Sequence, residues 1–179
     1  MRIISGKYKG KPFYPNKKFN ARPTTDFAKE GLFNILYNTI EFDGLEILDL
    51  FSGTGSISYE FLSRGCKTVH AVEKNRNHAM FIDKTAKELK ADNFKVFTSD
   101  VFKFIKNSTK LYNIIFADPP FDLESLKIIP DLIFDNKILK DDGIFILEHS
   151  NIYNFTNHKN FYDNRNYGKV NFSFFRYIL

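Results

Sequence analysis

The segment Asp118-Pro119-Pro120-Phe121 follows an apolar run and has residue types suited to catalysis. The two prolines stiffen the backbone, so the Asp118 carboxylate and the Pro119 carbonyl can be held as two fixed acceptors. Two acceptors match the two hydrogens of a planar nucleobase amine, whose nitrogen they would orient toward an electrophile. Phe121 offers a flat face on which the base can stack. By itself, the segment also fits a rigid loop after a strand.

A second group of residues has the chemistry of a nucleoside site. Gly53 and Gly55 follow another apolar run, and Glu73 stands 20 residues after Gly53. Glycine lets a ligand approach the backbone closely and tolerates positive φ in a tight turn. A carboxylate at the spacing of Glu73 can accept hydrogen bonds from both hydroxyls of a ribose. Up to this point the pattern also fits a dinucleotide.

Asp49 favours S-adenosylmethionine over a nicotinamide dinucleotide. The third glycine of the dinucleotide fingerprint is missing, because Ile57 and Ser58 follow Ser56. A carboxylate in this turn would repel a pyrophosphate but would attract a sulfonium or an amino group. S-adenosylmethionine carries both groups and also has a ribose for Glu73. The turn therefore predicts this cofactor.

A third acid completes the predicted cofactor site. Asp100 follows a third apolar run and can accept a hydrogen bond from the adenine amine while Val101 or Phe102 covers the ring. Lys74 follows Glu73 and fits either a ligand contact or a solvated charge at a helix start. The predicted cofactor-binding residues are Asp49, Phe51, Ser52, Gly53, Thr54, Gly55, Glu73, Lys74, Asp100 and Val101.

These residues need a parallel sheet to bring them together. Short apolar runs alternate with amphipathic ones, which is typical of strands joined by crossover helices. We expect strands at 46–51, 68–72, 94–98, 112–117 and 144–148, and helices at 26–37, 56–63, 75–89, 101–106 and 123–134. Two further strands, 160–167 and 170–179, flank a short turn and predict an antiparallel hairpin. The carboxyl ends of parallel strands meet at one edge of a sheet, so the four acids should gather there.

Length and composition fit one soluble globular domain. The chain has 179 residues, of which 43% are hydrophobic and 26% charged, and a net charge of +5. Residues 1–40 hold eight basic against two acidic side chains, a net +6, and the other 139 hold 18 against 19, a net −1. We therefore divide the domain into a basic extension, residues 1–40, and a catalytic part, residues 41–179. The basic extension suggests contact with a polyanion, although a solvated surface would look the same. Its basic residues are Arg2, Lys7, Lys9, Lys11, Lys17, Lys18, Arg22 and Lys29.

Other classes of site are disfavoured. The single cysteine, Cys66, excludes an internal disulfide, and the four histidines have no metal-ligand spacing, so we expect no metal. No apolar run approaches the roughly 18 to 20 residues of a membrane span, and no signal-peptide core follows the first residues. We expect a cytoplasmic protein that does not bind membranes.

The motifs resemble those of one enzyme family. The segment Arg22-Pro23-Thr24-Thr25-Asp26, together with the opening Ile3-Ile4-Ser5-Gly6-Lys7-Tyr8-Lys9-Gly10 and Asp118 to Phe121, resembles the bacterial RsmD family. That family uses S-adenosylmethionine to methylate the N2 amine of one guanine in 16S ribosomal RNA. The resemblance extends from the basic opening to the terminal hairpin. It implies a class I, Rossmann-like methyltransferase fold with seven strands, mostly parallel, and helices on both faces.

The resemblance also implies roles for residues. Asp118 to Phe121 would hold the guanine, and Arg22 to Thr25 would lie across the entrance for cofactor and substrate. Lys7, Lys9 and Lys11 would contact the RNA, which we expect in a small-subunit particle, with the protein acting as a monomer. One departure is that Lys11-Pro12-Phe13 stands where relatives have arginines. Lysine cannot bind a phosphate through two parallel hydrogen bonds as arginine does, which predicts that this stretch contacts RNA more weakly or in a different arrangement.

Three alternatives remain at this stage. An adenine-N6 DNA methyltransferase needs the same acceptor pair, although the chain leaves little room for a target-recognition segment. A nicotinamide oxidoreductase fits the glycines but not Asp49. A non-catalytic RNA-binding assembly factor fits the charge but not the intact Asp118-Pro119-Pro120-Phe121.

Overall fold

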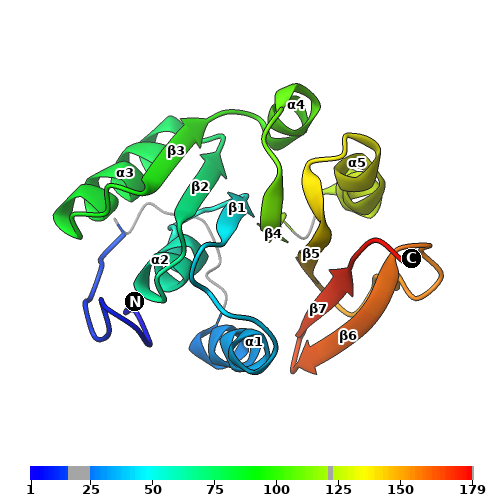
Figure 1. Ribbon diagram of the computed structural model, residues 1–179, viewed down its shortest axis with the longest axis horizontal. Coiled ribbons are helices and arrows are strands. Elements are labelled where there is room, and N and C mark those ends of the chain that lie inside the picture. The colour runs from blue at the N-terminus through cyan, green and yellow to red at the C-terminus, as the bar shows by residue number, and fades with distance from the viewer. Residues whose placement is uncertain (16–24, 121–122, 179) are drawn as a thin grey trace.

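Strands form at the apolar runs and pair into one seven-stranded sheet (Figure 1). The computed structural model describes residues 1–15, 25–120 and 123–178. The strand order is β3-β2-β1-β4-β5-β7-β6, in which the first five are parallel and β7 pairs antiparallel with both β5 and β6. This confirms the mostly parallel sheet with a C-terminal hairpin. The strands are β1 (Glu46–Leu50), β2 (Thr68–Glu73), β3 (Phe94–Thr98), β4 (Tyr112–Ala117), β5 (Leu139–His149), β6 (Phe161–Tyr167) and β7 (Val170–Phe175).

Helices cover both faces of the sheet, because the central strands are apolar on both sides. Ile47 of β1 packs with α1 (Asp26–Thr39), α2 (Ser56–Ser63) and α3 (Arg76–Glu88). Its neighbour Leu48 points to the other face, toward α4 (Val101–Asn107) and α5 (Ile129–Asp135). Successive residues of a strand point to opposite faces, so such a strand reads as a continuous apolar run.

Most element boundaries lie within two residues of the expected ones, and three elements differ more. The strand expected at 144–148 begins at Leu139, because Leu139 pairs with Tyr112 and a register irregularity carries β5 through the exposed Asp141 and Asp142. The helix expected at 123–134 is divided into the 3-10 helix η1 (Glu124–Ile128) and α5, since Pro130 has no amide hydrogen for a continuous α-helix. The last strand ends at Phe175 rather than at 179.

The first 13 residues fold back on themselves and pack against α2 (Figure 1). The Ile3 amide donates to the Lys11 carbonyl at 3.1 Å, and the Lys7 amide donates to the Ser63 carbonyl of α2 at 2.7 Å. Ile3, Tyr8 and Phe13 are buried in the same core cluster as α1 and α2. The segment that carries the predicted RNA-binding lysines is therefore also part of the core.

Lys29 corrects the charge count of the extension. Its side chain is fully buried in α1, 3.3 Å from a carboxylate oxygen of Glu60, and it donates to the Ser56 hydroxyl at 3.0 Å and to the Arg2 carbonyl at 3.1 Å. Arg64 contacts the other carboxylate oxygen of Glu60. Lys29 is thus a structural cation and takes no part in an RNA-binding surface. Arg2, Lys7, Lys9 and Lys11 are exposed, whereas Lys17, Lys18 and Arg22 lie outside the described residues.

Candidate active site

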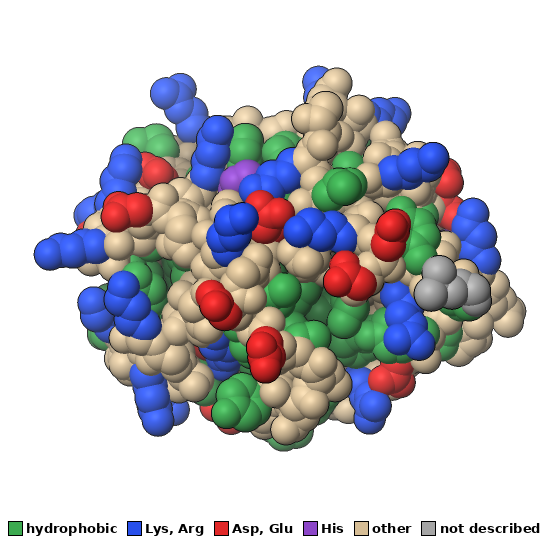
Figure 2. All heavy atoms as spheres, in the orientation of Figure 1, with side chains coloured by type: hydrophobic (Ala, Val, Ile, Leu, Met, Phe, Trp, Pro, Cys, Tyr) green, Lys and Arg blue, Asp and Glu red, His purple; other side chains and the backbone are tan. Residues whose placement is uncertain are grey.

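A cavity of about 610 Å³ opens at the carboxyl ends of β1, β2, β4 and β5. Figure 2 shows its mouth near the middle of one face, with hydrophobic side chains inside and acidic side chains around it. Most of the predicted site residues line this cavity, from both the cofactor group and the amine-binding group. They are Thr25, Asp49, Phe51, Ser52, Gly53, Thr54, Glu73, Lys74, Asp100, Val101, Asp118, Pro119 and Pro120. Arg22, Pro23, Thr24 and Phe121 were also predicted, but they lie outside the described residues.

The turn after β1 wraps closely around the end of β2. Phe51, Gly53 and Gly55 all have positive φ, of 59°, 54° and 78°. Gly55 precedes α2 and does not line the cavity; a Cβ there would lie 2.7 Å from the ring of Tyr59. Gly55 therefore shapes the turn by its backbone conformation and by its close packing against Tyr59.

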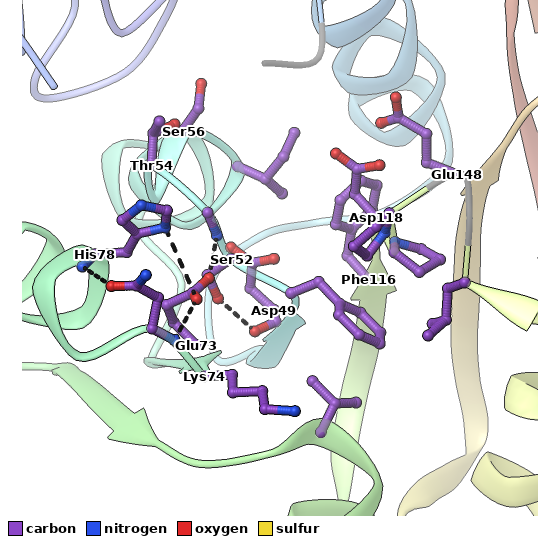
Figure 3. A pocket seen from close by; sticks show the side chains of 18 of the residues that line it. Asp49, Ser52, Thr54, Ser56, Glu73, Lys74, His78, Phe116, Asp118 and Glu148 are labelled. Atoms are coloured by element: carbon purple, nitrogen blue, oxygen red, sulfur yellow. Dashed lines mark hydrogen bonds and ion pairs between the residues drawn. The ribbon is translucent and has the colours of Figure 1, made fainter. Parts of the chain in front are cut away.

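Glu73 lines the cavity, and two backbone amides hold its carboxylate (Figure 3). One carboxylate oxygen accepts from the Gly53 amide at 2.9 Å and the other from the Asn75 amide at 2.7 Å. The Nδ1 atom of His78 lies 3.9 Å from the carboxylate oxygen that accepts from Asn75. These two hydrogen bonds fix the orientation of the carboxylate. Because each carboxylate oxygen has two lone pairs, each can still accept a hydrogen bond from a ribose hydroxyl.

Asp49 is a buried acid beside Glu73. The residue is 1% exposed, and the hydroxyl of Ser58 donates to its carboxylate. Burial raises the pKa of Asp49 to about 7, and the nearby charge of Glu73 adds to the effect. A cation bound here would favour the ionised form and reverse that shift. The site thus has the electrostatics expected of a pocket for a positively charged group.

Asp100 and Lys74 have partners of their own. Asp100 caps α4 by accepting from the Phe102 amide at 3.0 Å and the Lys103 amide at 3.3 Å, and its second oxygen lies 3.3 Å from the Lys74 ammonium. Burial works to raise the pKa of Asp100, but hydrogen bonds from the Lys103 amide and from Lys74 outweigh it and lower the pKa. The carboxylate predicted to accept from adenine is therefore already engaged in an N-cap and an ion pair.

Apolar side chains supply the walls that a flat ring needs. Phe51 and Phe102 meet edge to face, with centroids 6.4 Å apart, and Val101 and Ile57 also line the cavity. Acids at one end and apolar walls beside them fit a molecule with a cation, a ribose and an aromatic base. The residues present therefore fit S-adenosylmethionine.

The amine-binding segment begins where β4 ends. The Asp118 amide donates to the Leu50 carbonyl of β1 at 3.4 Å, which holds the segment against the turn after β1. Asp118, Pro119 and Pro120 line the same cavity as Glu73. Figure 3 shows the Asp118 carboxylate directed away from the Asp49 and Glu73 group, so the two predicted subsites are separate but continuous.

Sequence reasoning missed Glu148, the penultimate residue of β5, which lines the cavity beside Asp118. The residue is 2% exposed. A signal was present, because each of β1, β2, β3 and β4 has an acid at or near its carboxyl end, and Glu148 repeats that pattern at β5. His78 and Phe116 also line the cavity without having been predicted.

Other kinds of site are absent from the described ranges. Residues 1–15, 25–120 and 123–178 contain no group of three or more His, Cys, Asp or Glu side chains that could hold a metal ion. In the same ranges, every helix is too short or too polar to cross a membrane. Cys66 is buried, which raises the pKa of its thiol to about 12, so it is not a reactive nucleophile.

The chain is similar to proteins that are named as rRNA methyltransferases. The ribosomal RNA small subunit methyltransferase D of Escherichia coli strain K12 is 33% identical over 148 residues, which are 83% of this chain and 74% of that protein. The putative rRNA methyltransferase YlbH of Bacillus subtilis is 33% identical over 153 residues, which are 83% of this chain and 82% of the relative.

Solved structures share the fold over nearly the whole chain. A putative methyltransferase from Escherichia coli, yhhF, has a TM-score of 0.84 at 29% identity and covers 98% of this chain and 96% of its own. A putative methyltransferase complexed with SAH has a TM-score of 0.64 at 18% identity, covering 82% of this chain and 48% of its own, which is a likeness of fold alone.

A family model described as "Conserved hypothetical protein 95" matches residues 1–176. The resemblance to the RsmD proteins that the motifs indicated is thereby confirmed. On the match over nearly its whole length, this chain belongs to the conserved hypothetical protein 95 family and is a homologue of the ribosomal RNA small subunit methyltransferase D proteins.

Proposed function

We propose that this protein transfers a methyl group from S-adenosylmethionine to the N2 amine of a guanine in small-subunit ribosomal RNA. The observation that carries the proposal is one continuous cavity with two chemistries. Asp49 and Glu73 suit a cationic nucleoside at one end, and Asp118 with Pro119 suits a planar amine at the other. The homologues named as rRNA methyltransferases support the RNA substrate. By resemblance to the RsmD family, we propose guanine 966 of 16S rRNA as the target.

In this proposal the residues act mainly by position. When bound, S-adenosylmethionine supplies an electrophilic methyl group on a sulfonium. Asp49 and Glu73 hold the cationic and ribose parts, so that the methyl faces the amine. Asp118 and the Pro119 carbonyl each accept one amine hydrogen, which turns the nitrogen lone pair toward the methyl. The N–C bond forms as the S–C bond breaks, and Asp118 is positioned to take the proton that the amine must lose.

The basic opening supports docking of RNA. Lys7, Lys9 and Lys11 are exposed on the folded segment that packs on α2, where the side chains of Lys7 and Lys11 lie 5.2 and 5.5 Å from the Tyr8 ring. Cations held on a folded surface neutralise phosphates without first being ordered. We assign RNA contact to these three lysines, and we assign Thr25, which lines the cavity, to its entrance.

The test of the amine-binding role is Asp118→Asn. The amide keeps the size of the side chain but removes the charge and can take no proton. We expect methyl transfer to unmethylated small subunits to fall by about 100-fold or more, measured with labelled S-adenosylmethionine. Binding of S-adenosylhomocysteine by calorimetry should stay within about twofold, because Asp118 lies away from the cofactor acids.

The matched control is Asp43→Asn, which changes an exposed aspartate in the loop before β1. This variant should methylate at the wild-type rate. Full activity in Asp118→Asn would show that the carboxylate is dispensable and would refute the assigned role.

A further inference from the structure

Glu148 lies beside Asp118 at the amine-binding end of the cavity. The parallel strands β4 and β5 pair with Ala117 opposite Leu147, so Asp118 and Glu148 are the next residues on the two strands. Neighbouring strands are about 4.8 Å apart. Both residues line the cavity, and Figure 3 shows both carboxyl groups directed to the same side, away from Asp49 and Glu73.

Glu148 is buried, and two phenylalanines lie on the strands that flank β5. The residue is 2% exposed; Phe116 of β4, on the same wall of the cavity, is 1% exposed, and Phe172 of β7, its pairing partner, is fully buried. Glu148 lines the cavity, where its carboxylate can accept a hydrogen bond from a donor on a ligand and repels a lone pair on a ligand.

Nucleobases that carry an exocyclic amine differ in the ring nitrogen next to that amine. In guanine the N2 amine stands next to the N1–H, which is a donor. In adenine and cytosine the exocyclic amine stands next to a ring nitrogen with a lone pair, which is an acceptor. A second carboxylate beside the amine site accepts the N1–H of guanine and repels the lone pair of the other two bases.

We infer that Glu148 accepts a hydrogen bond from the guanine N1–H and thereby selects guanine over other bases that carry an amine. The inference rests on the proposed function, since it concerns the base whose amine Asp118 holds. It adds a specificity-determining contact to the methyl transfer. It also accounts for a choice that Asp118 and Pro119 cannot make alone, because two amine acceptors fit adenine as well as guanine.

The test replaces the target guanine by 2-aminopurine. This base keeps the 2-amino group but has a lone pair at N1. RNA that the wild-type protein methylates is synthesised with either base at the mapped target. We expect the wild-type protein to prefer guanine strongly. In Glu148→Gln the amide can donate to the N1 lone pair, so the ratio of guanine to 2-aminopurine methylation should fall by at least about tenfold.

A second readout needs no methyl transfer. Because 2-aminopurine is fluorescent and brightens when it leaves the base stack, its RNA reports insertion into the cavity without cofactor. We expect Glu148→Gln to bind this RNA more tightly than the wild-type protein does. Glu148→Asp keeps the carboxylate and should keep the preference for guanine. Glu41→Gln, an exposed glutamate before β1, is the matched control and should behave as the wild type.

The outcomes separate the two proposals. If the wild-type protein transfers no methyl to guanine in rRNA, the proposed function is wrong. If it methylates guanine, but Glu148→Gln lowers transfer to both bases equally, then Glu148 is only structural and the inference fails. Equal use of both bases by the wild-type protein would overturn it as well.

Discussion

Asp49 is the residue whose chemistry most depends on the bound cofactor. Burial raises its pKa to about 7 in the free protein, so near pH 6 most molecules carry the neutral acid. A sulfonium or ammonium beside it favours the carboxylate and lowers the pKa. Cofactor binding must therefore release a proton below pH 7, and the affinity must rise with pH until Asp49 is ionised in the free protein.

The expected result is an affinity about eightfold weaker at pH 6.0 than at pH 7.5, which follows from a free-protein pKa near 7 and a much lower value when bound. Calorimetry of S-adenosylmethionine at both pH values measures it. Asp49→Asn cannot titrate and should bind more weakly with a flatter pH profile. If both proteins show the same profile, the dependence arises from another group and Asp49 does not face the cation.

The residue scale also shows what the sequence reveals about a site. Asp49 and Glu73 could be predicted to line one cavity, because Asp49 lies just before the glycine turn and Glu73 stands 20 residues after Gly53 at the end of the next apolar run. The ion pair between Lys74 and Asp100 could not be predicted from the sequence, since it depends on where β2 and β3 end in space. Glu148 was missed because it is the last residue of the strand expected at 144–148 and looks like part of that strand until its neighbour Asp118 is placed beside it.

At the scale of elements, the buried Lys29 joins α1, α2 and the first residues. Its ammonium lies 3.3 Å from Glu60, and Glu60 in turn accepts from the Ile4 amide at 2.8 Å. Removing one member of a buried ion pair leaves the other charge poorly compensated. The network therefore holds the basic opening in place by way of α2.

We expect Lys29→Ala to lower the free energy of unfolding by about 3 kcal/mol, because Glu60 would keep only Arg64 as a cationic partner. Urea unfolding measures the change. Lys87→Ala removes an exposed ion pair with Asp83 and should cost no more than about 0.5 kcal/mol. Equal effects of the two substitutions would mean that burial of Lys29 contributes nothing.

Strand and helix positions were largely predictable, since apolar runs mark strands that are buried on both faces. The remaining errors have local causes. Pro130 divides an expected helix, and the pairing of Leu139 with Tyr112 extends β5 through residues too polar to predict a strand. Long-range pairing decides the second case, and no local pattern contains that information.

At the scale of the whole molecule, charge is separated by position. Acids gather around the cavity, and Lys7, Lys9 and Lys11 are exposed on the segment that packs on α2. Deleting that segment is a poor test of RNA binding, because Ile3 and Phe13 are buried in the core. Substitution of the lysines alone leaves the core intact.

We expect the triple change of Lys7, Lys9 and Lys11 to Gln to weaken RNA binding and to reduce the slope of log affinity against log salt by up to about 2 to 3. Filter binding across a salt series measures both. S-adenosylhomocysteine affinity should not change. Lys84, Lys87 and Lys90, exposed around α3, provide the matched triple control. A similar loss in both triple variants would indicate general charge attraction and no docking surface.

The central claim is methyl transfer to guanine N2 in small-subunit rRNA. The measurement that tests it most directly is incubation of unmethylated subunits with the protein and S-adenosylmethionine, followed by primer extension and mass spectrometry of the nucleosides. Our account predicts N2-methylguanosine and one new extension stop, both absent with Asp118→Asn. A product methylated on adenine, or no methylated nucleoside in the rRNA, would contradict it.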